Sequence, residues 1–168
     1  MLKYLYYKVV FAEIPGEISL GISISGCTIH CKGCHSTDLW EDKGTPLTID
    51  EIDSLLEHNP GITCILFLGG EHDVPYLSKI AKYTHQKIKT AWYCGLDSIP
   101  DNTDIMNYMD WIKVGPWDYT KGGLDSETTN QRMYRIYHYK DKNEKTDITS
   151  SFWKKKLILN SGYTSRDF

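Results

Sequence analysis

Residues 62–68 form the longest nearly uninterrupted apolar stretch of this 168-residue chain, and a glycine bounds it on each side. A stretch of this length is far shorter than the ~20 residues needed to cross a bilayer, so the chain is not predicted to span a membrane. Short apolar runs between glycines are typical of strands that are buried on both faces of a helix-covered parallel sheet. The stretch therefore predicts an α/β fold.

The segments around this stretch alternate between the apolar spacing of a helix, about every 3.6 residues, and that of a strand, every second residue. Thr48 and Glu51 form a capping box that opens a helix, and residues 59–61 end it. The remaining pattern predicts, in chain order, a strand over 18–25, a helix over 74–85, a strand over 89–94, a short helix over 104–109, a strand over 110–114, a loop over 116–130 and a late strand over 131–140. This order favours right-handed crossovers and a parallel sheet, with chemistry at the C-terminal ends of the strands.

Length and composition point to one globular domain over residues 1–168. A formal charge of -3 gives no electrostatic reason to expect a nucleic-acid partner, and the run Lys154, Lys155 and Lys156 is too short to change this. Residues 1–11 lack the continuous apolar core of a signal peptide. We therefore expect a cytoplasmic protein with neither a nucleic-acid nor a membrane partner.

The cysteines are unevenly distributed. Five are present, an odd number, and Cys27, Cys31 and Cys34 crowd into one short segment after the strand predicted over 18–25. This crowding is poor geometry for disulfides and good spacing for metal ligands, which fits the reducing cytosol.

Three thiolates from one loop suit three corners of a [4Fe–4S] cluster and leave the fourth iron open. A cluster with four cysteines is coordinatively full and suits electron transfer, whereas an open iron can chelate a substrate, by the logic that separates structural from catalytic zinc sites. The amine and carboxylate of an amino acid are suitable ligands for it.

A zinc knuckle is the alternative interpretation of the same cysteines, with His30 or His35 as the fourth ligand, and it would make the chain a non-catalytic interaction module. Structural zinc sites usually combine a C-x2-C pair with a second, well-separated ligand pair. The sequence has no such second pair, so the C-x3-C-x2-C spacing favours the cluster.

This spacing resembles the signature of the radical S-adenosylmethionine superfamily, on the loop after the first barrel strand. Gly69, Gly70 and Glu71 are similar to the superfamily's Gly-Gly-Glu segment, which ends the second strand and meets the amino group of S-adenosylmethionine. The resemblance implies an enzyme with a cluster on Cys27, Cys31 and Cys34. It also implies S-adenosylmethionine binding by a set of residues that comprises Gly33, Cys34, His35, Gly69, Gly70 and Glu71.

Within the superfamily, the chain is most similar to the activating enzymes of anaerobic (class III) ribonucleotide reductases. The similarity rests on five short segments. They are residues 25–35, with Gly33 before the last cysteine, residues 38–40, residues 93–95, residues 114–116, with a Gly-Pro pair, and residues 129–132, with Asn-Gln-Arg. It covers roughly residues 18–138. The tail over 141–168 matches no element of that family.

The resemblance implies a fold, a reaction and partners. The fold would be an open partial (β/α) barrel, since fewer than eight strand–helix units fit in this length. The enzyme would be an oxidoreductase that cleaves S-adenosylmethionine reductively and generates a glycyl radical on an anaerobic ribonucleoside-triphosphate reductase. Its electron donor would be a low-potential protein such as flavodoxin or ferredoxin. A radical enzyme that acts on another protein or on a small molecule is the competing interpretation.

Several residues keep two interpretations at this point. Cys64 lies within the apolar stretch and is expected to be a buried hydrophobe, whereas Cys94 at a strand end is either buried or a functional thiol. The residues of the Asn-Gln-Arg segment either close a turn or shape the site; they are Asn130, Gln131 and Arg132. Trp111 and Trp117 belong either to the core or to an interface.

Overall fold

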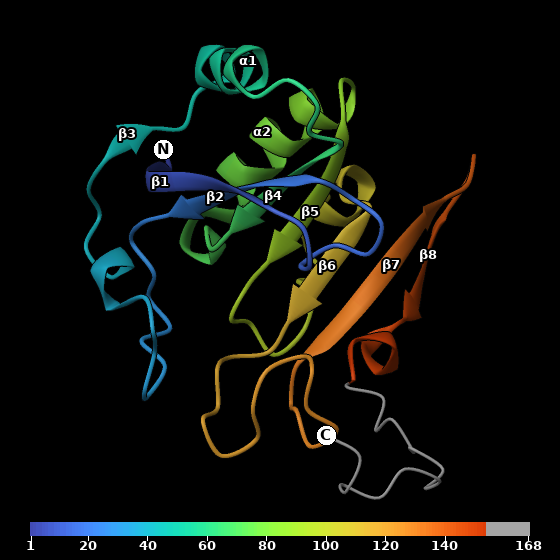
Figure 1. Cartoon of the computed structure of the whole chain (residues 1–168). Helices are drawn as coiled ribbons and strands as arrows, with labels where there is room; N and C mark the ends of the chain where they lie inside the picture. Colours follow the sequence, from blue (N-terminus) through green and yellow to red (C-terminus); the bar gives the residue numbers. More distant parts are fainter. Residues whose placement is uncertain (154–168) are drawn as a thin grey trace, which may run out of the picture.

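The computed structural model describes residues 1–153, and one mixed sheet runs through this part of the chain (Figure 1). Its strand order is β3-β1-β2-β4-β5-β6-β7-β8. The strands are β1 (Lys3–Val10), β2 (Ser19–Ile24), β3 (Thr45–Pro46), β4 (Cys64–Leu68), β5 (Lys89–Tyr93), β6 (Trp111–Val114), β7 (Arg132–His138) and β8 (Asn143–Asp147).

The four central strands are parallel. β2 pairs with β4, β4 with β5 and β5 with β6, with Ile65 opposite both Leu20 and Thr90. β1 and β3 extend the sheet on one side and β7 and β8 on the other, all by antiparallel pairing. The prediction of a parallel sheet is confirmed for these four strands, and each predicted strand exists within a few residues of its expected limits.

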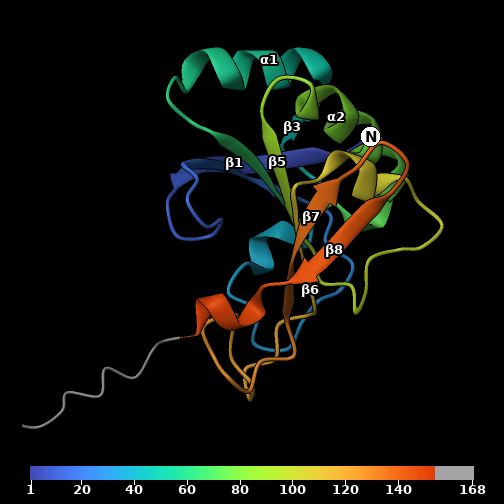
Figure 2. The same cartoon turned by 90° about the vertical axis from the view of Figure 1, so that its right-hand side faces the viewer.

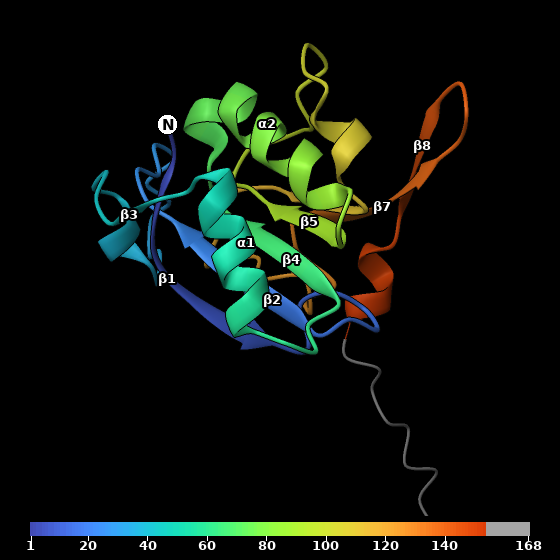
Figure 3. The same ribbon diagram turned by 90° about the horizontal axis from the view of Figure 1, so that it is seen from above.

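Two helices, α1 (Ile49–His58) and α2 (Val74–His85), cover one face of the sheet, as Figure 3 shows from above. Thr48 caps α1 through the amide of Glu51, as predicted, while the Glu51 carboxylate accepts a hydrogen bond from Tyr4. Single 3₁₀ turns form η1 (Thr37–Leu39), η2 (Glu71–Asp73), η3 (Ile105–Tyr108) and η4 (Thr149–Phe152), so the helix predicted over 104–109 is a 3₁₀ turn. No helix in residues 1–153 is long and apolar enough to span a membrane.

β4 shows why its sequence is apolar throughout. Ile65 and Phe67 pack into the larger core beneath the helices, whereas Cys64 and Leu66 belong to a smaller cluster on the opposite face, which also receives Phe152 from η4. Because side chains alternate between the faces of a strand, a strand covered on both faces has no polar positions.

Three outer strands, β1, β3 and β8, were not among the predicted elements. β1 has the sequence Lys-Tyr-Leu-Tyr-Tyr-Lys-Val-Val, β3 is only Thr-Pro, and β8 has the sequence Asn-Glu-Lys-Thr-Asp, so none has the apolar pattern of a core strand. β8 lies in the tail that the family resemblance left unassigned, and the lysines at 154–156 lie outside the described residues. The open partial barrel remains a prediction, because the strand order establishes an open mixed sheet and no more.

Candidate metal centre

The predicted cluster ligands lie at the C-terminal edge of the four parallel strands. The loop with Cys27, Cys31 and Cys34 follows β2, Glu71 follows β4, and Gly115 follows β6. Figure 1 shows the loops after β2 and β6 on the side toward which the arrowheads of these strands point. The loops enclose a cavity of about 240 Å³ that is lined by Ile24, Cys27, Cys31, Cys34, Ser36, Leu39, Leu68, Gly69, Glu71, Tyr93, Gly95, Lys113, Gly115, Trp117 and Gln131.

Backbone geometry sets the course of the cysteine loop. Gly26 and Gly33 have φ angles of 81° and 71°, which glycine adopts at little cost. His30 has φ 50°, the one positive value at a non-glycine residue in the described chain, and its ring stacks on Trp40 with centroids 4.4 Å apart. The Cys27 amide donates to the Leu39 carbonyl at 3.0 Å. The glycines, the stacked ring and this hydrogen bond together define the course of the loop.

The end of β5 supports this loop from the neighbouring strand. A Cβ atom at Gly95 would lie 3.0 Å from Ile29 Cγ1, so a larger residue there would push the Ile29 side chain away. The tyrosine-x-glycine segment over 93–95 is thus a contact surface for the cysteine loop.

Cys27 is in direct contact with Glu71. Its Sγ lies 3.4 Å from Glu71 Oε1. Burial raises the pKa of the Cys27 thiol, and the Glu71 carboxylate acts in the same direction, against hydrogen bonds from the backbone of Ile29 and His30. The other carboxylate oxygen, Glu71 Oε2, is buried without a hydrogen-bond partner. An orphaned carboxylate oxygen in a cavity is suited to receive a cation.

The fold itself accounts for the two glycines, Gly69 and Gly70, that precede Glu71. The Gly69 amide donates to the Tyr93 carbonyl at 2.9 Å, and the Gly69 carbonyl accepts from Trp92 Nε1 at 2.8 Å. Gly70 has φ 92°, and a Cβ there would crowd Ile24 at 3.2 Å. Gly69 and Glu71 line the cavity, whereas Gly70 packs behind them.

A buried cation, Lys113, faces the same cavity from β6. Its ammonium donates to the Gly115 carbonyl at 2.9 Å. Burial lowers the pKa of Lys113, while nearby Cys94, Cys31 and Glu71 favour the charged form. A positive charge beside several thiolates offsets part of their mutual repulsion, so Lys113 fits a cavity that holds an anionic cluster.

Besides Gly70, two more residues predicted to bind the cofactor, Gly33 and His35, lie outside this cavity lining. A Cβ at Gly33 would lie 3.7 Å from Tyr119, and the His35 ring meets Trp117 edge-on with centroids 5.4 Å apart. Both contacts connect the cysteine loop to the loop after β6. Lys32, Trp117 and Tyr119 also line a neighbouring surface cavity of about 450 Å³.

The late Asn-Gln-Arg element closes the loop after β6. Asn130 Nδ2 donates to the Pro116 carbonyl at 3.0 Å, while Asn130 Oδ1 is buried without a partner. A Cβ at Gly115 would lie 2.8 Å from Gln131 Cα, which accounts for the glycine. Gln131 lines the cavity, whereas Arg132 donates to the carbonyls of Thr129 and Gln131. The element thus serves as both a turn and a wall of the site.

The remaining two cysteines are buried away from the cavity lining. Cys64 lies on the face of β4 opposite the helices, as expected of a small hydrophobe, and burial raises its pKa to about 12. Burial also raises the pKa of Cys94 to about 12, and its thiol donates to the Lys113 carbonyl at 3.5 Å. Both side chains are core groups in the structure.

The spacing of the loop sulfurs bears on the choice between a cluster and a zinc ion. A tetrahedral zinc site gathers its sulfurs to about 3.8 Å from one another. Within residues 1–153, no group of three ligand atoms that lie mutually within 4.8 Å includes a cysteine of this loop. A cubane cluster, in which each cysteine binds a different iron, holds its sulfurs farther apart than one zinc ion does, and metal analysis of the protein distinguishes the two.

Sequence reasoning missed two cavity residues, Tyr93 as a lining side chain and Lys113. The one signal for Lys113 is a lysine inside the otherwise apolar strand β6, Trp-Ile-Lys-Val. A charged residue in a buried strand is rare without a partner, so it marks a functional or paired position. Lys113 also lines an adjoining cavity of about 370 Å³, together with Tyr93 and Gln131.

Comparison with known proteins gives one assignment. No curated protein and no solved structure matches the chain significantly. Residues 15–137 match the family model described as "4Fe-4S single cluster domain". The match includes Cys27, Cys31, Cys34 and Glu71 and ends within β7. The three loop thiols, a buried cation and an orphaned carboxylate oxygen fit a cluster at this edge of the sheet, and the chain belongs to the family of 4Fe-4S single cluster domains.

Proposed function

We propose that the chain is a radical S-adenosylmethionine enzyme of the activating type, which generates a glycyl radical on an anaerobic ribonucleotide reductase. The observation that carries the proposal is the meeting of Cys27, Cys31 and Cys34 with Glu71 around one cavity. Three thiolates leave one iron of a [4Fe–4S] cluster without a protein ligand. When bound there, the cluster supplies one electron and S-adenosylmethionine supplies the carbon radical that takes a hydrogen atom from the partner.

Glu71 is the residue proposed to orient S-adenosylmethionine. Its Oε2 has no partner, and its Oε1 lies beside Cys27 Sγ at 3.4 Å. A carboxylate in this place attracts the α-ammonium group of an amino acid and holds it next to the cluster. The partly buried cavity wall, including Leu39 and Leu68, excludes water from this region.

Trp117 is proposed to contact the nucleoside end of the same molecule. Its indole Nε1 is buried without a partner, and its ring lies against His35 from the cysteine loop. An indole N–H needs an acceptor when it is buried, which a nucleoside hydroxyl or ring nitrogen supplies.

A protein substrate is favoured by the openness of the site. The cluster cavity adjoins the 370 Å³ cavity through Tyr93, Lys113 and Gln131. Beside the cysteine loop, Tyr119 is 57% exposed and Lys32 lies over its ring at 5.6 Å. Exposed aromatic and cationic side chains of this kind are typical anchors at protein interfaces.

The proposal is tested with cluster-reconstituted protein, S-adenosylmethionine and a low-potential reductant under anaerobic conditions. We expect 5′-deoxyadenosine to form and, with the anaerobic ribonucleotide reductase of the same organism, a glycyl radical doublet in the electron paramagnetic resonance spectrum. A reductase whose radical glycine is replaced by alanine is the matched control and should give no doublet. The proposal would be wrong if S-adenosylmethionine is cleaved without a glycyl radical doublet while a small molecule is turned over stoichiometrically. The chain would then act on a small molecule and not on the reductase.

A further inference from the structure

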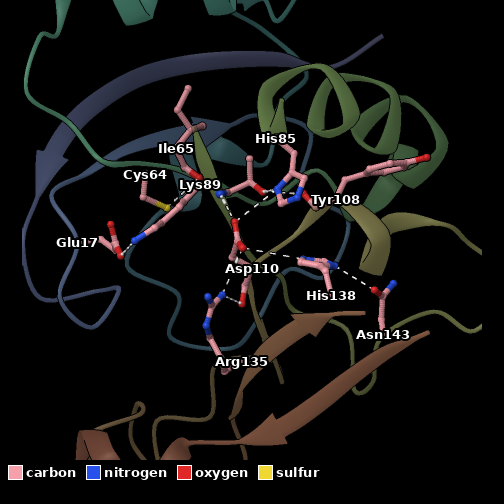
Figure 4. Close-up of polar contacts among 11 residues, drawn as sticks. Glu17, Cys64, Ile65, His85, Lys89, Tyr108, Asp110, Arg135, His138 and Asn143 are labelled. Atoms are coloured by element: carbon pink, nitrogen blue, oxygen red, sulfur yellow. Dashed lines mark hydrogen bonds and ion pairs between the residues drawn. The ribbon is translucent and has the colours of Figure 1, made fainter. Parts of the chain in front are cut away.

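A second group of metal-ligating side chains lies at the opposite end of the parallel strands from the cysteine loop. His85 is the last residue of α2, Asp110 directly precedes β6, and His138 ends β7. One ligand atom from each lies within 4.8 Å of the others (Figure 4). The five residues of β5 separate the two ends by about 15 Å. We propose that these three residues form a binding site for a divalent transition-metal ion of the zinc class.

The distances are close to those of a metal site. Asp110 Oδ2 lies 3.5 Å from His85 Nδ1, and Asp110 Oδ1 lies 3.9 Å from His138 Nε2. Ligand atoms around a tetrahedral zinc ion are about 3.3 Å apart. The side chains of His85 and His138 are each 29% exposed, so the imidazoles can close this gap and the ion can enter from solvent.

The hydrogen bonds of His138 determine which nitrogen faces Asp110. Asn143 Nδ2 donates to Asn107 Oδ1 at 2.6 Å, which directs the Asn143 carbonyl oxygen toward His138 Nδ1 at 3.0 Å. With the two amides in this orientation, Nδ1 carries the proton, and in the neutral ring Nε2 presents its lone pair to the Asp110 carboxylate. Two acceptors face each other, and a cation between them removes the repulsion. A metal-bound histidine typically donates its other N–H to an oxygen in this way.

His85 changes its proton position on binding. Thr90 Oγ1 donates to the Tyr108 carbonyl at 2.6 Å, so it accepts from His85 Nδ1, which lies 3.2 Å away. Coordination through Nδ1 moves the proton of the neutral ring to the exposed Nε2, with no net proton release. Two imidazoles and one carboxylate favour Zn²⁺ over Mg²⁺ or Ca²⁺, which prefer oxygen ligands.

Asp110 is held in place by its own donors. The Thr90 amide donates to Oδ2 at 2.9 Å, and Arg135 Nη1 lies 3.4 Å from Oδ1 while donating to the Asp110 carbonyl at 2.6 Å. Such contacts orient a ligating carboxylate, but the guanidinium also repels a metal ion. We therefore expect a dissociation constant on the order of 1–10 µM rather than nanomolar.

The three residues come from three separate elements. An ion there joins the end of α2 to β6 and to the β7–β8 hairpin, which Figure 2 shows at the edge of the sheet. The site would thus secure the antiparallel edge to the parallel core without contact with the cysteine loop.

The test is an anaerobic titration of cluster-reconstituted protein with Zn²⁺ after passage over a chelating resin, with zinc and iron counted per chain. We expect one zinc per chain, unchanged iron content and visible absorption, and a higher melting temperature. His138→Gln and His85→Gln should each weaken zinc binding at least ~10-fold. His58→Gln is the matched control, since His58 lies at the end of α1, and it should bind zinc like the unmodified protein.

Three outcomes would overturn the proposal. The first is that no zinc binds with a dissociation constant below about 100 µM. The positive charge beside Asp110 would then come from a protonated histidine and not from a metal ion. The second is loss of iron as zinc is taken up, which would assign the zinc to the cysteines. The third is zinc binding by both His138→Gln and His85→Gln that equals binding by the unmodified protein.

Discussion

The two ends of the parallel strands differ in how their buried polar groups are satisfied. At the C-terminal end, buried polar atoms of Trp40, Glu71, Trp117 and Asn130 have no partner, and these are four of the six such atoms in the described chain. At the N-terminal end, one such atom, Ser19 Oγ, lies at the start of β2, whereas Asp110 accepts a hydrogen bond from the Thr90 amide and pairs with Arg135. Since native proteins rarely leave buried polar groups unpaired, the first end has the character of a site completed by a ligand.

The same contrast appears in the cysteines. Cys27, Cys31 and Cys34 are partly accessible at the C-terminal end, whereas Cys64 and Cys94 are buried. Position in the fold, and not residue type, separates a ligand from a core side chain. The predictions below test this division, from the largest expected effect to the smallest.

Replacing one loop cysteine should have the largest effect. Cys27→Ala, Cys31→Ala or Cys34→Ala removes one iron ligand, and we expect each to abolish S-adenosylmethionine cleavage. Iron content and 5′-deoxyadenosine formation measure the loss. Cys64→Ala is the control and should retain the cluster and nearly all cleavage, and cluster loss in this variant as complete as in Cys34→Ala would refute the ligand assignment.

Glu71→Gln should weaken binding of S-adenosylmethionine by about 10–100-fold, because a charge-assisted hydrogen bond contributes about 1.5–3 kcal/mol. Equilibrium binding to the cluster-reconstituted protein measures this. Glu57→Gln on the exposed surface of α1 is the matched control and should bind like the unmodified protein. Equal affinity for Glu71→Gln and Glu57→Gln would remove Glu71 from the site.

Asp110→Asn should destabilise the fold by about 1–3 kcal/mol, because the side chain is only 11% exposed and the charge that pairs with Arg135 is lost. Urea denaturation measures this change, and the affinity for S-adenosylmethionine should stay within about 3-fold of the original. Asp53→Asn, in the surface pair with Lys87, should cost much less. A large loss of affinity without a loss of stability would show that the two ends are not independent.

The smallest expected effect is on the reactivity of Cys64 and Cys94. Burial raises the pKa of both thiols to about 12, so at pH 8 both are almost entirely protonated. Iodoacetamide treatment of the folded, cluster-free chain should therefore label the three loop cysteines and spare these two. Mass spectrometry locates the label, and rapid modification of Cys94 would place it in the accessible site.

The sequence predicts the parallel core and the metal ligands because both are local patterns. The apolar stretch around β4, the Thr48 cap and the cysteine spacing each lie within a few consecutive residues. Lys113 and the group of His85, Asp110 and His138 come from separate elements that only the sheet order brings together. The outer strands β1, β3 and β8 escape prediction because backbone pairing to their neighbours, and not an apolar face, selects them.

The central claim is that the three loop cysteines leave one iron open for S-adenosylmethionine. The most direct test is the electron paramagnetic resonance spectrum of the reduced, reconstituted cluster with and without S-adenosylmethionine. The account predicts a [4Fe–4S]⁺ signal whose g values change when S-adenosylmethionine is added, since coordination alters one iron. An identical spectrum in the presence of saturating S-adenosylmethionine, or a chain with zinc and no iron, would contradict it.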